Sequence, residues 1–253
     1  MIVMKSLKAL ILTLILSISI AGSAQNWTEI QKVLPPNDSS SPVGGQGDEF
    51  GRSIAVSGDY AVVSAPEADN GSSSSGSVFL YERSGGTWSF TAEITASDGA
   101  QDHLFGLSLA MKDSVMIIGA PGASPLATGS GAAYIYRLDN TGTWVEEAKI
   151  FPAVGSSYDQ FGFSVDIDDD IAVAGANFDD DNGTQSGSAY VFEYDGSTWV
   201  EIAQLLASDG AYQDQFGRDI AVDDTLVVAG AFSQDGFANN GGAIYAYRRD
   251  GYE

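Results

Sequence analysis

The side chains best suited to bind a metal ion lie in one acidic loop. Asn177, Asp179 and Asp181 alternate along the chain, and Gly183 follows them. Alternating Asp and Asn oxygens before a glycine are typical of the early positions of a calcium-binding loop, although the glutamate that closes such loops is absent here. The sequence therefore predicts a Ca²⁺ site at these three side chains, with a solvated acidic loop tip as the alternative.

Catalytic residue types show no recognisable arrangement in this chain. Cysteine is absent, and neither a nucleophile elbow nor a phosphate-binding glycine loop occurs. A glycan-processing hydrolase would use a pair of carboxylates. Such pairs are expected in any chain with 34 acidic residues, so they do not by themselves indicate an enzyme. We therefore expect no catalytic residues and no cofactor other than Ca²⁺, and we keep a secreted hydrolase, or a fragment of one, as the alternative.

The N-terminus has the pattern of a secretory signal peptide over residues 1–24. Met1–Lys8 is basic, Ala9–Ile20 is apolar, and Gly22–Ala24 offers small residues before a cut. The apolar run is shorter than the roughly 20 residues of a membrane-spanning helix. An uncleaved N-terminal anchor is the alternative. We expect residues 25–253 to be exported to the cell surface or beyond, without membrane insertion after cleavage.

The charge balance restricts the classes of partner. The chain carries 34 acidic and 11 basic residues, for a net charge of −23. Such a charge repels nucleic acid and anionic membranes, which excludes both as partners. It permits divalent cations, and it also keeps an exported protein soluble.

The folded region is a fourfold repeat. A Phe-Gly pair recurs at intervals of 55 or 56 residues, at Phe50, Phe105, Phe161 and Phe216. The residue two positions earlier marks the start of each repeat, at Asp48, His103, Asp159 and Asp214. A fixed period of this size is typical of stacked or radial repeats.

Each repeat holds four candidate strands. The first begins at Phe-Gly, the second is an apolar run such as Ile171–Gly175, the third carries aromatic residues, as in Ser188–Phe192, and the fourth opens on Trp88, Trp144 or Trp199. Strands apolar on both faces suit burial between neighbouring sheets. The sequence therefore predicts an all-β protein, a β-propeller of four four-stranded blades.

The recurrence also assigns roles to single residues. The Asp two positions before Phe-Gly predicts a turn in which a short side chain accepts backbone amides. His103 occupies this position in the second repeat, which favours a structural role over general-base catalysis. The repeated Trp and Tyr residues could form a sugar-binding surface, but their strict phase favours packing between blades.

An additional strand precedes the first repeat. Trp88, Trp144 and Trp199 each lie 17 residues before the next Phe, and Trp27 lies 23 before Phe50. The segment Asn26–Leu34 also alternates apolar and polar residues, which predicts a fourth-type strand. This Trp27 strand either completes the last blade and closes a ring of four, or the chain is a fragment of a larger propeller.

The repeat resembles the FG-GAP repeat of integrin α-subunit β-propellers. The resemblance rests on Phe-Gly followed by Gly119-Ala120-Pro121, or its variants in the other repeats, and covers about Trp27 to Tyr247. It implies an extracellular propeller for adhesion or ligand binding, often with Ca²⁺ between the first two strands. Turns such as Asp168–Asp170 are too short to wrap an ion at that position.

These observations lead to one expected function. We expect an exported, non-enzymatic binding or adhesion module that uses loops on one face of a propeller, because loops on rigid scaffolds carry function. Its partner would be an extracellular protein or glycan. A structural repeat module within a larger surface protein, with further repeats or domains in a longer chain, is the other alternative.

Overall fold

The computed structural model describes residues 27–36, 47–235 and 240–249, so the predicted signal peptide lies outside the described residues. The chain divides into two compact units, residues 1–32 and 33–253. In the first unit, Trp27–Lys32 forms no strand or helix. The second unit holds all the strands described below. None of the described residues form a helix that could cross a membrane.

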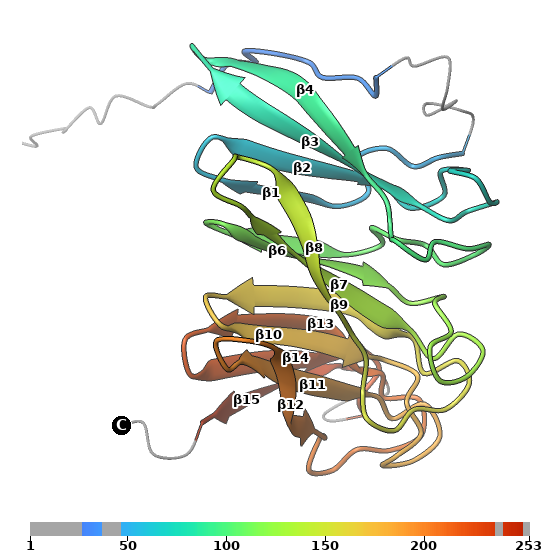
Figure 1. Cartoon of the computed structure of the whole chain (residues 1–253). Coiled ribbons are helices and arrows are strands. Elements are labelled where there is room, and N and C mark those ends of the chain that lie inside the picture. The colour runs from blue at the N-terminus through green and yellow to red at the C-terminus, as the bar shows by residue number, and fades with distance from the viewer. Residues whose placement is uncertain (1–26, 37–46, 236–239, 250–253) are drawn as a thin grey trace, which may run out of the picture. The chain divides into compact units, whose positions relative to one another are not determined.

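The second unit consists of four antiparallel sheets in chain order (Figure 1). The first contains β1 (Ile54–Ser57), β2 (Tyr60–Ala65), β3 (Ser77–Ser84) and β4 (Thr87–Ile94), and the second contains β5 (Leu109–Lys112), β6 (Val115–Ala120), β7 (Ala132–Leu138) and β8 (Trp144–Ile150). The third contains β9 (Phe161–Asp168), β10 (Ile171–Ala176), β11 (Ser188–Tyr194) and β12 (Trp199–Leu205), and the fourth contains β13 (Phe216–Asp223), β14 (Leu226–Ala231) and β15 (Ala243–Arg248).

Every sheet pairs its strands in sequence order, and one sheet corresponds to each Phe-Gly repeat. The all-β prediction is thereby confirmed. The fourth sheet has three strands among the described residues. In the described part of the chain, no sheet closes on itself. The arrangement is that of propeller blades packed face to face.

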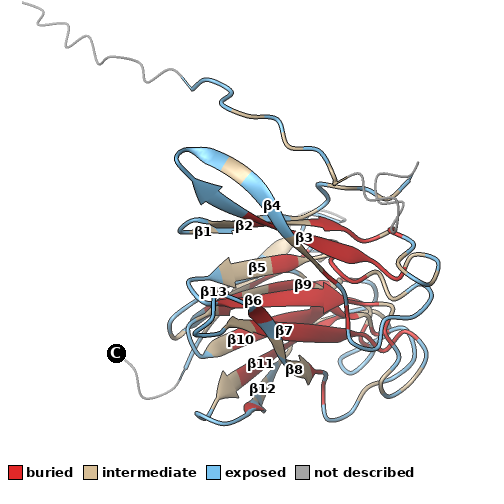
Figure 2. Ribbon diagram, turned by 45° about the horizontal axis from the view of Figure 1, so that its top comes forward, coloured by how far each residue is buried: buried red, intermediate tan, exposed pale blue. Residues whose placement is uncertain are grey.

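Three hydrophobic cores lie between consecutive sheets. In the core between the second and third sheets, Ile117 and Ile135 of one sheet contact Phe161 and Val165 of the next. Equivalent cores join the first sheet to the second and the third to the fourth. The second strands β6 and β10 are apolar on both faces because cores lie on both sides of the second and third sheets. Figure 2 shows burial concentrated on the inner strands, with β1 and β4 largely exposed.

Trp144 and Trp199 are 8% and 7% exposed, so they pack in the interior as the repeat phase predicts. Trp199 also donates its indole N–H to Glu147 of the preceding repeat at 3.0 Å. These two residues are therefore unavailable as a sugar-binding surface.

The prediction of a strand beginning at Trp27 is wrong for the described residues. A strand requires a hydrogen-bonded neighbour, and none of the strands that the structure describes pairs with residues 27–36. The end of the segment still keeps the phase of the repeat. Tyr81 donates its hydroxyl to the Leu34 carbonyl at 3.3 Å, as Tyr136 does to Thr95 and Tyr247 to Leu206.

The turns between the first two strands of each repeat are as short as predicted. Asp169 and Asp170 alone connect β9 to β10, and Asp169 has a φ of 51°. Their side chains and backbone join neighbouring repeats: Lys112 forms an ion pair with Asp168 at 2.9 Å, and Asp168 accepts the Asp224 N–H at 2.8 Å.

Packing predicts different effects at two tryptophans. We expect Trp199→Ala to reduce the free energy of unfolding by about 3–5 kcal/mol, because it leaves a cavity in a packed interior. Trp27 is 95% exposed, so Trp27→Ala serves as the control and should change stability by less than about 0.5 kcal/mol. Urea unfolding of both variants checks this. Similar small losses would contradict a packing role for Trp199.

Candidate ligand-binding loop edge

The long loops of the first three repeats meet the linkers of the next repeat at one edge of the sheets, which we call the loop edge (Figure 1). The linker before Phe161 donates three backbone N–H groups to the loop after β6. Tyr158, Gln160 and Phe161 donate to the carbonyls of Thr128, Gly129 and Ser130 at 2.9, 3.2 and 3.0 Å. The linkers before Phe105 and Phe216 repeat this pattern with their preceding loops.

Two of the donor residues in each of these linkers have an unusual backbone conformation. Tyr158 and Gln160 have φ values of 69° and 59°, in the left-handed region that non-glycine residues seldom adopt. Asp102 and Leu104 in the second repeat, and Gln213 and Gln215 in the fourth, adopt the same conformation. Tertiary hydrogen bonds therefore hold each linker in a strained conformation.

The residue between the two strained positions caps the turn, as the sequence predicts. Asp159 accepts the Ser156 N–H, and Asp214 accepts the Ala211 N–H at 2.8 Å. His103 has the same role, because its Nδ1 accepts the Ala100 N–H at 3.3 Å. Burial lowers the pKa of His103, which favours the neutral ring that this hydrogen bond needs.

A second repeated feature is a tyrosine bonded to a carboxylate. Tyr134 donates its hydroxyl to Asp98 at 2.6 Å, and Tyr245 donates to Asp209 at 2.6 Å. Both carboxylates come from the Ala-Ser-Asp-Gly-Ala linker, seven residues before Phe-Gly. The third repeat has Val154 at that position.

Asp179 supplies the missing acceptor in the third repeat. It lies in the loop after β10 and accepts the Tyr190 hydroxyl at 2.7 Å. The first and second repeats have the buried alanines Ala68 and Ala123 at the position of Asp179. In the third repeat, the carboxylate that accepts the tyrosine hydroxyl therefore comes from the loop and not from the linker. This role accounts for Asp179 in the acidic loop.

The three predicted calcium ligands lie in different surroundings. Asp179 is 3% exposed and also accepts the Asp181 N–H at 2.8 Å, while the Asp181 carboxylate accepts the Gln204 side chain at 2.7 Å. Asn177 is fully buried, and its amide has no hydrogen-bond partner in the described part of the chain. Among the described residues, no three His, Asp or Glu side chains are grouped to hold a metal. Calcium binding at these residues stays a prediction.

Burial also determines the ionisation of this region. It raises the pKa of Asp159 to about 6, and the neighbouring acids Asp179, Asp180 and Asp181 contribute in the same direction. Burial likewise raises the pKa of Asp179, although its hydrogen bonds oppose this. The third repeat therefore concentrates costly negative charge beneath its loops.

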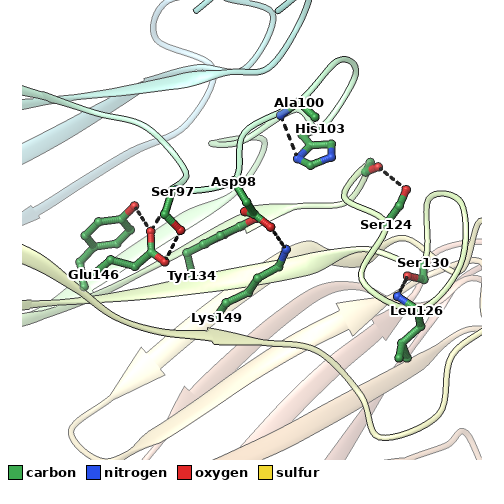
Figure 3. A network of polar contacts seen from close by, with 12 residues as sticks. Ser97, Asp98, Ala100, His103, Ser124, Leu126, Ser130, Tyr134, Glu146 and Lys149 are labelled. Carbon is green, nitrogen blue, oxygen red and sulfur yellow. Dashed lines mark hydrogen bonds and ion pairs between the residues drawn. The ribbon is translucent and has the colours of Figure 1, made fainter. Parts of the chain in front are cut away.

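The second repeat instead pairs an acidic side chain with a basic one, and Figure 3 shows Asp98 beside Lys149 and Tyr134. Lys149 contacts Asp98 at 2.6 Å and lies over the Tyr134 ring, 5.2 Å from its centroid. Although burial acts to raise it, hydrogen bonds from Lys149 and Tyr134 lower the pKa of Asp98. Nearby, Glu146 accepts the hydroxyls of Ser97 and Tyr136 at 2.7 and 3.1 Å. These contacts join the linker to the sheet.

Three apolar side chains are exposed close together on the loop edge. Leu126, Val154 and Tyr158, which we call the loop patch, are 43%, 81% and 63% exposed. Leu126 Cδ1 lies 3.2 Å from the position of a Cβ on Gly155, and the Tyr158 ring lies 3.1 Å from that position on Gly129. The loop after β6 and the following linker therefore form one surface.

Sequence reasoning missed the loop patch, although a signal existed. The linker Phe151–Gln160 departs from the Ala-Ser-Asp-Gly-Ala motif that the second and fourth repeats share. An exposed Val154 replaces the tyrosine-binding Asp, and Tyr158 replaces a small or polar residue. The difference at Val154 and Tyr158 can be recognised only when the linkers are aligned with one another on their Phe-Gly pairs.

These features define a repeat protein in which the linker before a sheet is hydrogen-bonded to a loop of the preceding sheet. The FG-GAP repeat model matches residues 27–81, 88–136, 144–192 and 199–247. The chain therefore belongs to the FG-GAP repeat family. Each matched range begins at a tryptophan and ends in a third strand, so the family unit extends across two sheets, apart from the first.

One solved structure that this chain matches is the crystal structure of Saccharomyces cerevisiae Sqt1, at 9% sequence identity and a TM-score of 0.47. The match covers 80% of this chain and 46% of that one, so this chain spans about half the length of the protein it matches.

The different position of the tyrosine-binding carboxylate in the third repeat predicts that one substitution restores the stability lost by another. Asp179→Ala should cost about 1–3 kcal/mol, because the buried Tyr190 hydroxyl loses its acceptor. Adding Val154→Asp should recover most of this loss by restoring the acceptor that the other linkers use. Urea unfolding of the single and double variants measures the coupling. A double variant no more stable than Asp179→Ala would contradict the exchange.

The raised pKa of Asp159 predicts a pH effect. Its folded pKa of about 6 exceeds the ordinary value of about 3.9, so the folded state binds more protons between these pH values. Ionisation of Asp159 therefore destabilises the fold as pH rises from about 4 to 6. Asp159→Asn keeps the cap without this charge and should gain stability relative to the native chain over that range. Thermal melts at both pH values test this, and a constant difference would contradict it.

Proposed function

We propose that this chain is an exported, non-enzymatic binding or adhesion module that takes an extracellular protein or glycan on its loop edge. The observation that carries the proposal is Tyr158. A bulky aromatic residue here has a φ of 69° and is 63% exposed. Strain at an exposed position is maintained only where the surrounding structure enforces it, and such positions cluster at functional sites.

The chemistry of the loop patch suits either kind of ligand. Tyrosine offers an apolar ring face and a hydroxyl at low conformational cost, and it is enriched where proteins bind each other. The same ring face can stack on the apolar face of a sugar. Val154 and Leu126 extend the apolar area, and Tyr212, 68% exposed, comes from the linker before the fourth sheet.

The scaffold beneath the patch supports recognition because it is rigid. Hydrogen bonds to Thr128, Gly129 and Ser130 fix the linker that carries Tyr158 and Val154. Loops held in this way lose little conformational entropy when they bind. Export is inferred from the N-terminal pattern of a basic segment, an apolar run and small residues.

Replacing Tyr158 should separate binding from stability. Tyr158→Gly removes the ring and relieves the positive φ, and the first repeat already has Gly47 at this position. We expect binding on a glycan array and to immobilised extracellular-matrix proteins to be lost, while the melting temperature stays the same or rises.

The matched control is Val200→Ser on β12, where Val200 is 44% exposed away from the loops. It should leave binding unchanged. Equal binding by the native chain and Tyr158→Gly would contradict a role for the loop patch, and turnover of an arrayed glycan would favour the hydrolase alternative.

A further inference from the structure

A cleft collects the residues that follow the Phe-Gly pairs of three repeats. Arg52, Phe163 and Arg218 each come directly after a Phe-Gly pair, and all three line one cleft of about 710 Å³. The fourth sheet and the loop within it supply most of the remaining lining, including Phe232 and Ile244. The cleft therefore joins side chains from the first, third and fourth repeats.

Arg218 is fixed in this cleft by two aromatic rings and one hydrogen bond. Its guanidinium carbon lies 5.1 Å from the centroid of the Phe163 ring and 5.0 Å from that of Phe232. Its Nη1 donates to Gln215 Oε1 at 2.9 Å. Aromatic faces attract a guanidinium, so these contacts orient the group before any ligand is present and reduce the entropy lost on binding.

The charge of Arg218 has no carboxylate partner within the described residues. Three basic side chains are half-buried in that part of the chain. Arg137 forms an ion pair with Glu147 at 2.7 Å, and Lys149 forms one with Asp98 at 2.6 Å. Arg218 forms none. Because buried charges are normally paired and this chain has 34 acidic residues, the guanidinium of Arg218 is suited to an anion that comes from outside the chain.

Two acidic side chains limit what the rest of the cleft contributes. Arg52 lies 4.0 Å from Glu49, and the two side chains are 51% and 48% exposed, so this ion pair is weak and Arg52 adds only long-range attraction. Asp219 also lines the cleft. It repels a bare anion, but its carboxylate can accept a hydroxyl of a ligand that carries both kinds of group.

We propose that this cleft binds a short oligosaccharide with one acidic sugar, whose carboxylate binds Arg218. A planar guanidinium and a carboxylate form two parallel hydrogen bonds. Phe232 and Ile244, 65% and 79% exposed, offer apolar surface to the faces of the sugar rings. The cleft volume lies within the range of about 300–1,000 Å³ that is typical of small-ligand sites. The site shares no residue with the loop patch, so it does not depend on the function proposed above.

The net charge of the chain restricts the length of this ligand. A long acidic polymer brings many negative charges towards a protein with a net charge of −23, which repels it. A single carboxylate on an otherwise neutral oligosaccharide meets Arg218 without this accumulated repulsion. The ligand is therefore a sugar with one acidic unit and not a polyuronate or a heavily sulfated glycan.

Two matched disaccharides test the ligand class. Cellobiouronic acid and cellobiose have the same two rings and differ in one position, which is a carboxylate in the first and a CH₂OH group in the second. Calorimetric titration of the full chain with each disaccharide isolates the effect of the carboxylate. We expect the acid to bind about tenfold more tightly or better, because its hydrogen bonds to Arg218 are charge-assisted. Acetate at the same concentration should not displace it, because acetate has no sugar ring.

Three variants locate the site. Arg218→Leu should abolish the preference for the acid, and the second repeat already has Leu107 at this position, so the fold should tolerate it. Arg248→Gln is the matched control. It removes the same charge from the exposed end of β15 and should leave the preference unchanged. Phe232→Asn, which introduces the residue of the third repeat, should weaken binding of both disaccharides and carries the test if Arg218→Leu does not fold.

Four results would overturn the proposal. The first is equal binding of the acid and the neutral disaccharide by the native chain, and the second is no binding of either at millimolar concentration. The third is an equal loss of preference in Arg218→Leu and Arg248→Gln, which would assign the effect to net charge. The fourth is displacement of cellobiouronic acid by acetate, which would indicate a site for simple anions.

Discussion

The structure depends on close contact between the backbones of the last three Phe-Gly segments and the glycines of the preceding sheets. At Gly131 and Gly187, two segments of the chain approach so closely that any side chain on the glycine would overlap the backbone of Phe161 or Phe216. The contact aligns the linker so that its N–H groups bond to the neighbouring loop, and it directs the Phe ring into the core between the sheets. Phe161 then packs against Tyr190 of its own third strand, with ring centroids 5.6 Å apart.

This constraint explains what the sequence could predict. The last three Phe-Gly pairs, the apolar second strands, and Trp144 and Trp199 serve the joints between sheets, and their recurrence reveals the repeat. The capping role of Asp159 and His103 follows from the same recurrence. The Trp27 strand was predicted wrongly because phase shows where a strand belongs in the repeat, whereas a strand also needs a neighbouring strand to pair with.

The features that the sequence did not reveal are those in which one repeat departs from the others. Asp179 is not recognisable as the acceptor for Tyr190 until the structure brings the loop after β10 beside that ring. Its alternation with Asn177 and Asp181 instead suggested calcium. The loop patch was missed for a related reason, since Val154 and Tyr158 are notable only in comparison with Asp98 and Asp102. Because the joints hold the sheets, the linkers and loops are free to diverge in this way.

The most direct measurement of the central claim is native-state hydrogen exchange at the amides of Phe105, Phe161 and Phe216. These amides donate to Ser75, Ser130 and Ser186 across the joints at 3.1, 3.0 and 2.8 Å. If the joints hold the fold together, the three amides should exchange only through global unfolding, as slowly as amides of β6 and β10. Exchange at the rates of exposed loops, while β6 and β10 stay protected, would show that the sheets are stable without these contacts and would contradict the account.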